Sequence, residues 1–155
     1  MSVRADFKGA KLSELGLFPP VAVQEETPAG EVIRLMQRAR VGCVLVCRGE
    51  RFEGLFSEWD ALQKVVGRPE MYERPVGEAM TRIHWVLSPG DSVSTAIAHL
   101  TEEGVRHAPV VDSDGNAVGV VTAASLMRFL VEFFPREVLN QPPRSDQAME
   151  NREGG

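Results

Sequence analysis

The sequence contains two copies of one pattern of apolar residues, and this repeat limits the folds open to the chain. Leu12 corresponds to Val76, and the same offset aligns the apolar positions that follow. In the second half of each copy, Gly54 corresponds to Gly119, so the offset there is larger by one position. A single insertion into a hairpin loop explains the change, because loops tolerate insertions and paired strands do not. We therefore expect two lobes of one architecture.

Each copy predicts the element order β-α-β-β-α. In the second copy we expect a strand at 84–87, a helix capped by Asp91 or Ser92 and stopped by Gly104, a hairpin of strands 108–112 and 118–121, and a helix from Thr122. The first copy repeats this order. Two helices cannot cover both faces of a three-stranded sheet, so the two lobes are expected to pack together about a pseudo-twofold axis. The predicted fold class is mixed α/β (α+β).

These lobes leave a segment at each end of the chain. We expect an N-terminal extension at 1–10, the first lobe at 11–70, the second lobe at 71–134 and a polar C-terminal tail at 135–155. The tail is expected to be either disordered or an arm held across a partner. Apolar residues on several faces of the last helix exceed what one small lobe can bury, which predicts a homodimer through the terminal helices of the lobes. They include Leu130, Phe133 and Phe134.

Charge and hydropathy exclude several classes of protein. The 155 residues are 43% hydrophobic and include 17 basic and 22 acidic side chains, a net charge of −5. An acidic chain without a basic run predicts no nucleic-acid binding and no attachment to an anionic membrane surface. We find no apolar run long enough to span a bilayer and no signal peptide, so we expect a cytoplasmic location.

The junction at Gly54–Asp60 is the best candidate for a functional site. A short apolar run is followed by Ser57 and, three residues later, by Asp60, the spacing of a strand that ends where a capped helix begins. Such a pair can cap the helix or can bind a ligand at the helix N-terminus. The second copy has Thr122 and Ser125 at these positions and therefore lacks the carboxylate.

Other chemically interesting residues are predicted to be structural. Cys43 and Cys47 lie in an apolar run and are expected to be reduced core residues. Trp59 and Trp85 are expected to pack the lobes and not to hold a base. The three histidines have no spacing typical of a metal site, and we find no catalytic motif, so neither metal binding nor enzyme activity is expected.

The tandem pattern resembles a pair of cystathionine-β-synthase (CBS) domains, also called a Bateman module. The residues that carry the resemblance are Ala108-Pro-Val-Val-Asp-Ser-Asp-Gly-Asn-Ala-Val-Gly-Val-Val-Thr in one copy and Gly-Leu-Phe-Ser-Glu-Trp-Asp in the other. The resemblance implies a regulatory, energy-sensing module that binds an adenosine compound in clefts between its lobes, commonly as a disc-shaped homodimer. It implies no obligatory cofactor. AMP, ADP or ATP would be the effector, and the protein it regulates is left open.

The resemblance also assigns residues to two clefts. In the first cleft, Ser57 would approach phosphate and Asp60 would hold the ribose, and the other expected contacts are Gly42, Cys43, Met80, Thr81, Ile83, Val105 and Arg106. For the second, degenerate cleft the expected residues are Thr122, Ser125, Arg106, His107, Leu17, Phe18 and Val41. Arg106 and His107 add the positive charge that a polyphosphate needs. The alternative function is a structural or partner-binding adaptor whose clefts hold no ligand.

Overall fold

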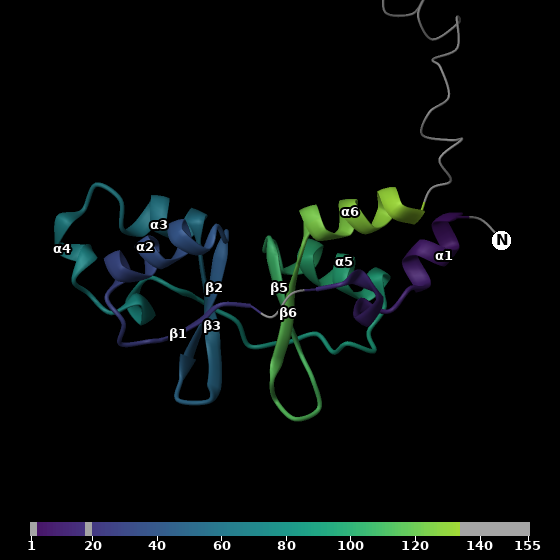
Figure 1. Ribbon diagram of the computed structural model, residues 1–155, viewed down its shortest axis with the longest axis horizontal. Coiled ribbons are helices and arrows are strands. Elements are labelled where there is room, and N and C mark those ends of the chain that lie inside the picture. The colour runs from purple at the N-terminus through teal and green to yellow at the C-terminus, as the bar shows by residue number, and fades with distance from the viewer. Residues whose placement is uncertain (1–2, 18–19, 134–155) are drawn as a thin grey trace, which may run out of the picture.

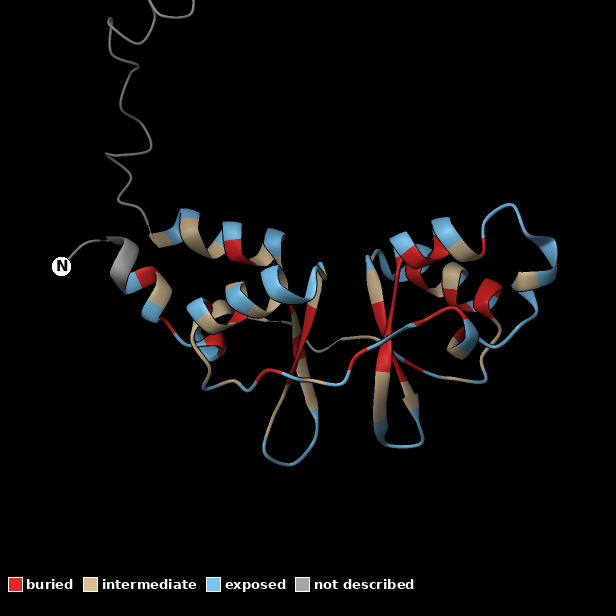
Figure 2. Cartoon of the chain, turned by 180° about the vertical axis from the view of Figure 1, so that it is seen from behind, coloured by how far each residue is buried: buried red, intermediate tan, exposed pale blue. Residues whose placement is uncertain are grey.

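The structure is a computed structural model and describes residues 3–17 and 20–133. The predicted tail, together with Phe18 and Phe134, lies outside the described residues. Two lobes stand side by side, each with strands on one side and helices on the other (Figure 1). Buried residues gather on the strands and on the helix faces turned towards them (Figure 2). The mixed α+β architecture with two related lobes is as predicted.

The first lobe is built on a four-stranded sheet in the order β1-β2-β3-β4. Its strands are β1 (Ala22–Gln24), β2 (Cys43–Arg48), β3 (Arg51–Ser57) and β4 (Thr81–Arg82). Its helices are α2 (Ala29–Ala39), α3 (Glu58–Lys64) and the short α4 (Pro69–Tyr72), with a 3₁₀ turn, η2, at Val76–Glu78. β2 runs parallel to β1 and antiparallel to β3. The β-branched run in β2 suits this central position, since its middle residues are buried.

The second lobe repeats this plan with a smaller sheet. It consists of α5 (Val93–Glu103), β5 (His107–Val111), β6 (Ala117–Thr122) and α6 (Ala123–Phe133). Ser92 caps α5 by accepting from the Thr95 N–H at 3.1 Å, and Gly104 ends the helix with a φ of 63°. The predicted cap and stop are confirmed.

The predicted strand at 84–87 is reduced to one paired residue. Leu87 forms a single parallel bridge with Val110, donating to the Pro109 carbonyl and accepting from the Val111 N–H. Residues 83–86 before it have no regular secondary structure. Trp85 and Ile83 pack against residues of both sheets there, so side-chain packing replaces the strand pairing.

Two segments are exchanged between the lobes. Helix α1 (Val3–Gly9) and the 3₁₀ turn η1 (Leu12–Leu15) pack on the second lobe, whereas η2 and β4 pack on the first. The hydrogen bonds of the exchange occur in pairs at corresponding positions of the repeat. The Leu12 N–H donates to Asp91 at 2.9 Å, and the Val76 N–H donates to Thr27 at 2.8 Å. The two copies of the repeat thus exchange equivalent segments about the pseudo-twofold axis.

Helix α1 covers much of the apolar surface that the sequence assigned to a dimer. The Phe7 ring lies 5.8 Å from the ring of Phe129 and 6.1 Å from that of Phe133, measured between centroids. Leu130 packs against the same cluster. These residues therefore belong largely to the core of the second lobe, and their surplus apolar surface is met by the chain's own N-terminal helix.

Candidate functional site

Ser57 and Asp60 form a complete capping box at the start of α3. The Ser57 hydroxyl accepts from the Asp60 N–H at 3.2 Å, and Asp60 Oδ2 accepts from the Ser57 N–H at 3.0 Å. This arrangement satisfies two backbone donors that a helix start would otherwise leave unpaired. The capping alternative raised from the sequence is therefore present in the structure.

The Asp60 carboxylate does more than cap the helix. Its Oδ1 accepts from Lys64 Nζ at 3.1 Å and from the Thr81 hydroxyl at 2.8 Å, and its Oδ2 also accepts from the Ser57 hydroxyl at 3.1 Å. Lys64 in turn donates to the carbonyl oxygens of Ala79 and Met80 at 3.0 and 3.4 Å. Asp60 is only 5% exposed, so α3 and the chain around β4 are joined through a nearly buried charge.

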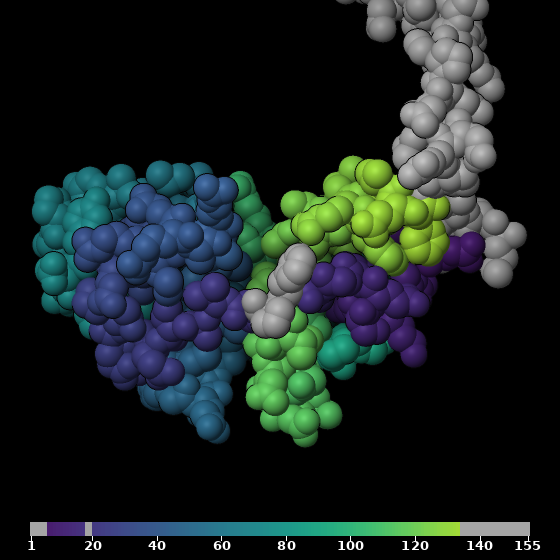
Figure 3. All heavy atoms as spheres, viewed as in Figure 1, coloured from purple at the N-terminus to yellow at the C-terminus, as the bar shows by residue number. Residues whose placement is uncertain are grey.

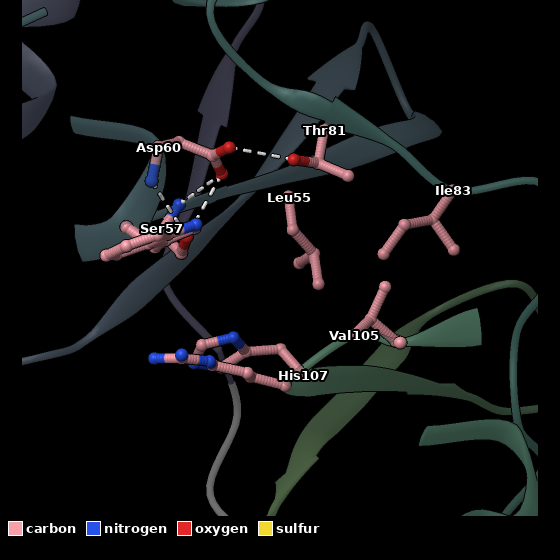
Figure 4. A pocket seen from close by; sticks show the side chains of 10 residues that line it. Leu55, Ser57, Asp60, Thr81, Ile83, Val105 and His107 are labelled. Carbon is pink, nitrogen blue, oxygen red and sulfur yellow. Dashed lines mark hydrogen bonds between the residues drawn. The ribbon is translucent and has the colours of Figure 1, made fainter. Parts of the chain in front are cut away.

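The same carboxylate borders a cavity of about 280 Å³ between the lobes. The surface is visibly hollowed along the line where the lobes meet (Figure 3). On the first-lobe side, Ser57 and Asp60 come from the junction of β3 and α3, and Thr81 comes from β4. Figure 4 shows Thr81 facing Asp60, with the apolar side chains of Leu55, Ile83 and Val105 beside them. We refer to this cavity as the first cleft.

The second lobe contributes the basic wall of the first cleft. Arg106 and His107 lie at the start of β5, and the Arg106 guanidinium is 5.3 Å from the centroid of the Trp59 ring, a cation–π contact across the cleft. Burial lowers the pKa of His107. Its neighbour Arg106 acts in the same direction, and the nearby Asp60 and Glu58 partly oppose the shift. The cleft therefore places one carboxylate opposite one permanent cation.

A second cavity of about 410 Å³ lies on the other side of the pseudo-twofold axis. Thr122 and Ser125 reproduce the junction without a carboxylate: the Thr122 N–H donates to the Ser125 hydroxyl at 2.8 Å, and that hydroxyl donates to the Thr122 carbonyl at 2.8 Å. Leu17, Val41 and His107 line this second cleft as expected, and Arg128 lines it as well. Arg106, which was also expected here, lines the first cleft instead. The location of Phe18 falls outside the described residues.

The structure moves three predicted residues out of the first cleft. Gly42 and Cys43 line the second cleft, and Met80 is buried in the core of the first lobe, where only its carbonyl takes part in the Lys64 network. The repeat explains the first two. Because each cleft is closed by the start of the other copy's second strand, Gly42 and Cys43 lie in the second cleft as their counterparts Arg106 and His107 lie in the first.

Three lining or supporting residues were missed from the sequence. Trp59 is 50% exposed and borders the first cleft, where its ring meets Arg106 of the other lobe, so the structure places it at the cleft and not in a core. Lys64 was detectable, since it follows Asp60 at the i,i+4 spacing of helical ion pairs. Arg128 was detectable from its position, because a residue three positions after Ser125 lies on the same face of a helix. Trp59 gave no such signal, because its direction depends on the geometry of the cap.

Two further observations concern the cysteines and the possible metal ligands in the described part of the chain. Cys43 and Cys47 are free and half-buried, and burial together with Glu58 and Asp60 raises the pKa of the Cys43 thiol to about 11. Among residues 3–17 and 20–133, no three His, Cys, Asp or Glu side chains are grouped so that they could bind a metal ion. None of the helices described there has the length and apolar character needed to cross a bilayer.

Known proteins similar to this chain include longer ones. The choline transport ATP-binding protein of Bacillus subtilis is 26% identical over 108 residues, which are 70% of this chain and 27% of that protein. Inosine-5′-monophosphate dehydrogenase of Aquifex aeolicus is 28% identical over 121 residues, which are 76% of this chain and 24% of that protein. The chain thus spans about a quarter of the length of these two relatives.

A solved structure and a family model identify the repeat. A CBS-domain protein from Pyrobaculum aerophilum, complexed with AMP, superposes with a TM-score of 0.69 at 26% identity, covering 84% of this chain and 95% of that one. The family model of the CBS domain matches twice, at residues 13–67 and 76–132, which together are most of the chain. The protein therefore belongs to the CBS-domain family and carries a tandem pair of these domains.

Proposed function

We propose that the protein is a regulatory module that binds an adenine nucleotide in the first cleft. The observation that carries this proposal is the Asp60 carboxylate, nearly buried, bordering a cavity whose opposite wall holds Arg106. A carboxylate suits the two hydroxyls of a ribose, and a guanidinium suits a phosphate. Leu55, Ile83 and Val105 supply apolar surface for a base. The related Pyrobaculum protein was solved with AMP, which supports this class of ligand.

The size of the first cleft favours the smallest nucleotide of the class. About 280 Å³ lies just below the range of roughly 300–1,000 Å³ usual for small-molecule sites. AMP is therefore our first choice of effector, ahead of ADP and ATP. The second cleft lacks a carboxylate, so we propose that nucleotides bind there weakly or not at all. No cofactor is needed for this function, and no catalytic step is proposed.

We further propose that the module acts as a homodimer in the cytoplasm. Two free cysteines fit a reducing compartment. Exposed apolar residues recur at matching positions of the repeat, on or next to α3 and on α6, and these two helices lie on the same side of the molecule (Figure 1). Leu62 and Val66, on α3 and just after it, correspond in the repeat to Met127 and Val131 on α6. A twofold partner could cover both pairs at once.

The alternative, an adaptor without a ligand, also has an observation in its favour. All four hydrogen bonds to the Asp60 carboxylate are supplied by the protein itself, so this group has a structural role without any nucleotide. An adaptor would keep Asp60 to hold α3 against β4. Arg106 distinguishes the two functions, because a purely structural Asp60 has no need of a guanidinium across the cavity.

A thermal-shift titration tests the proposal. A ligand that binds only the folded state stabilises it by about 2.7 kcal/mol when present at 100 times its dissociation constant. We expect AMP to raise Tm in a dose-dependent manner and adenine nucleotides with longer phosphate chains to act less strongly. If AMP, ADP, ATP, NAD and S-adenosylmethionine at millimolar concentration all leave Tm unchanged, the adaptor function should be adopted.

A further inference from the structure

Asp60 has no acceptor position to spare. An ionised carboxylate offers about four lone-pair sites on its two oxygens. Four donors fill them: Lys64 and the Thr81 hydroxyl on Oδ1, and the N–H and hydroxyl of Ser57 on Oδ2. A ribose hydroxyl can donate to this carboxylate only if one of these donors leaves. Which donor leaves then influences how strongly any ribose-containing ligand binds.

Three of the four donors are fixed by other structure. The Ser57 N–H belongs to the capping box, so moving it would open the first turn of α3. Lys64 Nζ also donates to the carbonyls of Ala79 and Met80, so removing it from Asp60 would disturb three contacts. The Ser57 oxygen stays 3.1 Å from Oδ2 because it accepts from the Asp60 N–H, so it blocks that position even when its proton turns elsewhere.

Thr81 is the donor that can leave most easily. Its hydroxyl makes one hydrogen bond within the described chain, to Asp60 Oδ1. Thr81 is itself exposed, and its side chain borders the cleft (Figure 4). Rotation about one side-chain bond would free Oδ1 without moving the backbone of β4. The Lys64 ammonium would stay in place and keep the carboxylate oriented.

The repeat shows that these residues change together. In the repeat, the counterparts of Asp60, Lys64 and Thr81 are Ser125, Phe129 and Leu17, at the offsets that align the two copies. Where the carboxylate is absent, its lysine and its hydroxyl partner are absent too. A threonine needed only to pair β4 with β3 would have no reason to change with Asp60.

We propose that the Thr81 hydroxyl occupies the position on Asp60 that a ribose hydroxyl would take, so that a nucleotide must displace it. Thr81 is then a built-in competitor that sets the affinity of the first cleft for ribose. This inference rests on the proposed function, since it requires a ribose-containing ligand. It also predicts the opposite effect from a Thr81 that binds the ligand: removing the hydroxyl should strengthen binding.

Calorimetric titration of Thr81→Val with AMP tests the inference. The substitution keeps the shape of the side chain and removes the competing donor, so AMP affinity should rise by about 10- to 150-fold, the worth of one hydrogen bond to a charged group. Thr81→Ser, which keeps the hydroxyl, should bind as the wild type does. Thr101→Val is the matched control, because the Thr101 hydroxyl bonds the Ile97 carbonyl on an exposed face of α5.

A second nucleotide distinguishes the loss of a competing hydroxyl from a change in the packing of the cleft. The affinity for 2′,3′-dideoxy-AMP, which cannot donate to Asp60, should be the same in the wild type and in Thr81→Val. Equal or weaker AMP binding by Thr81→Val, or equal gains with both nucleotides, would overturn the inference and leave the proposed function standing. Failure of AMP to bind any variant would overturn both. If Thr81→Val does not fold, Thr81→Ala removes the same hydroxyl.

Discussion

At the scale of a single residue, Asp60 combines a structural role with a position on the proposed binding cleft. Its carboxylate caps α3, pairs with Lys64 and accepts from Thr81, while it also borders the first cleft. The capping box alone would be worth about 0.5–2 kcal/mol. The additional bonds tie α3 to the chain around β4, so the residue contributes more to folding than its position at a helix start suggests.

Asp60→Ala should weaken AMP binding far more than Ser125→Ala. The loss of the one charge-assisted bond that a ribose hydroxyl would make to Asp60 corresponds to about 1.5–3 kcal/mol, or roughly 10- to 150-fold in affinity. We expect titration calorimetry to give one strong site per chain in the wild type and none in Asp60→Ala. A denaturant melt of the free protein measures the separate loss of stability, about 2–4 kcal/mol for a nearly buried, fully bonded carboxylate. Unchanged AMP affinity in Asp60→Ala would mean that Asp60 is only a structural residue.

His107 should make the folded state less stable as the solution is acidified. Its pKa is lowered in the folded protein by burial, so between the folded value and the unfolded value of about 6.5 the unfolded chain binds more protons. The stability that neutral His107 provides is complete above the unfolded pKa and is lost as pH falls towards the folded one. Asp60 and Glu58 limit the effect, and Arg106 increases it.

Melting temperatures measured from about pH 8 to about pH 5.5 test this prediction, since this window spans the unfolded pKa of histidine. His107→Gln should flatten the decline in Tm in the lower part of the window relative to the wild type, whereas His84→Gln, on an exposed position, should leave it unchanged. Parallel declines in the wild type and His107→Gln would assign the pH dependence to other groups.

The sequence identified the first-cleft pair Ser57 and Asp60 because a cap motif and a repeat both point to local chain geometry. It could not assign Gly42 and Cys43 to the correct cleft, since that depends on how the two lobes pack, with the start of each second strand closing the cleft of the other copy. It also missed Trp59, whose direction follows from the three-dimensional packing at the cap. Spacing along one helix would have found Lys64, so that omission was avoidable.

At the scale of elements, the pairing of β4 with β3 includes a close contact between the two backbones at one glycine. Gly54 pairs with Arg82 in the β3–β4 ladder, and a Cβ at Gly54 would overlap the Thr81 carbonyl oxygen. The corresponding residue, Gly119, has the same relation to the exchanged N-terminal segment, where a Cβ would lie 2.5 Å from Leu17 Cβ. Each glycine therefore makes room for the segment that the other lobe contributes.

Gly54→Ala should destabilise the fold because the neighbour is backbone and cannot move aside alone. We expect a loss of about 1–3 kcal/mol in the free energy of unfolding, the usual range for overpacking. Gly90→Ala is the control, since a Cβ there meets nothing within 4 Å and the residue has an ordinary φ. Chemical denaturation of both variants measures the difference; equal stabilities would show that β4 does not need this close approach.

The elements that the sequence predicted well are those with strong local signals. The Ser92 cap, the Gly104 stop and the hairpin around Gly115 all depend on neighbouring residues, and all are observed. The strand at 84–87 and helix α1 depend instead on residues that are distant in the sequence. The first depends on which partner strand reaches it, and the second is stabilised by Phe129 and Phe133, at the far end of the described chain.

For the whole molecule, the exchange of segments makes the two lobes interdependent. Leu12 completes the core of the second lobe, and Val76 completes that of the first, each fully buried. The core of the second lobe joins residues 7–17 to residues 85–133, whereas the core of the first lobe lies within residues 21–80 and includes residues 76–80 of the second copy. A nucleotide in the first cleft would contact residues from α3, β4 and β5, so binding would act on both lobes together.

The whole molecule also presents a repeated apolar surface for a second copy. Leu62 and Met127 are 61% and 57% exposed, and Val66 and Val131 are 49% and 50% exposed, and in each lobe the two residues lie about one helical turn apart along the chain. The predicted dimer should therefore use these four residues, because Phe133 is already covered by α1. A single patch of this kind on each lobe suits an interface with twofold symmetry.

Sedimentation velocity at tens of micromolar should give a dimer with twice the 17.0 kDa mass of one chain for the wild type. The double variant Leu62→Glu with Met127→Glu places an unpaired charge at both halves of the interface and should sediment as a folded monomer, since a buried, unpaired charge is strongly unfavourable. Val86→Glu is the control, because Val86 is a comparably exposed apolar residue away from α3 and α6. A monomeric wild type, or a dimer that survives the double substitution, would contradict this surface. Retained AMP binding by the monomeric variant would show in addition that the first cleft is complete within one chain.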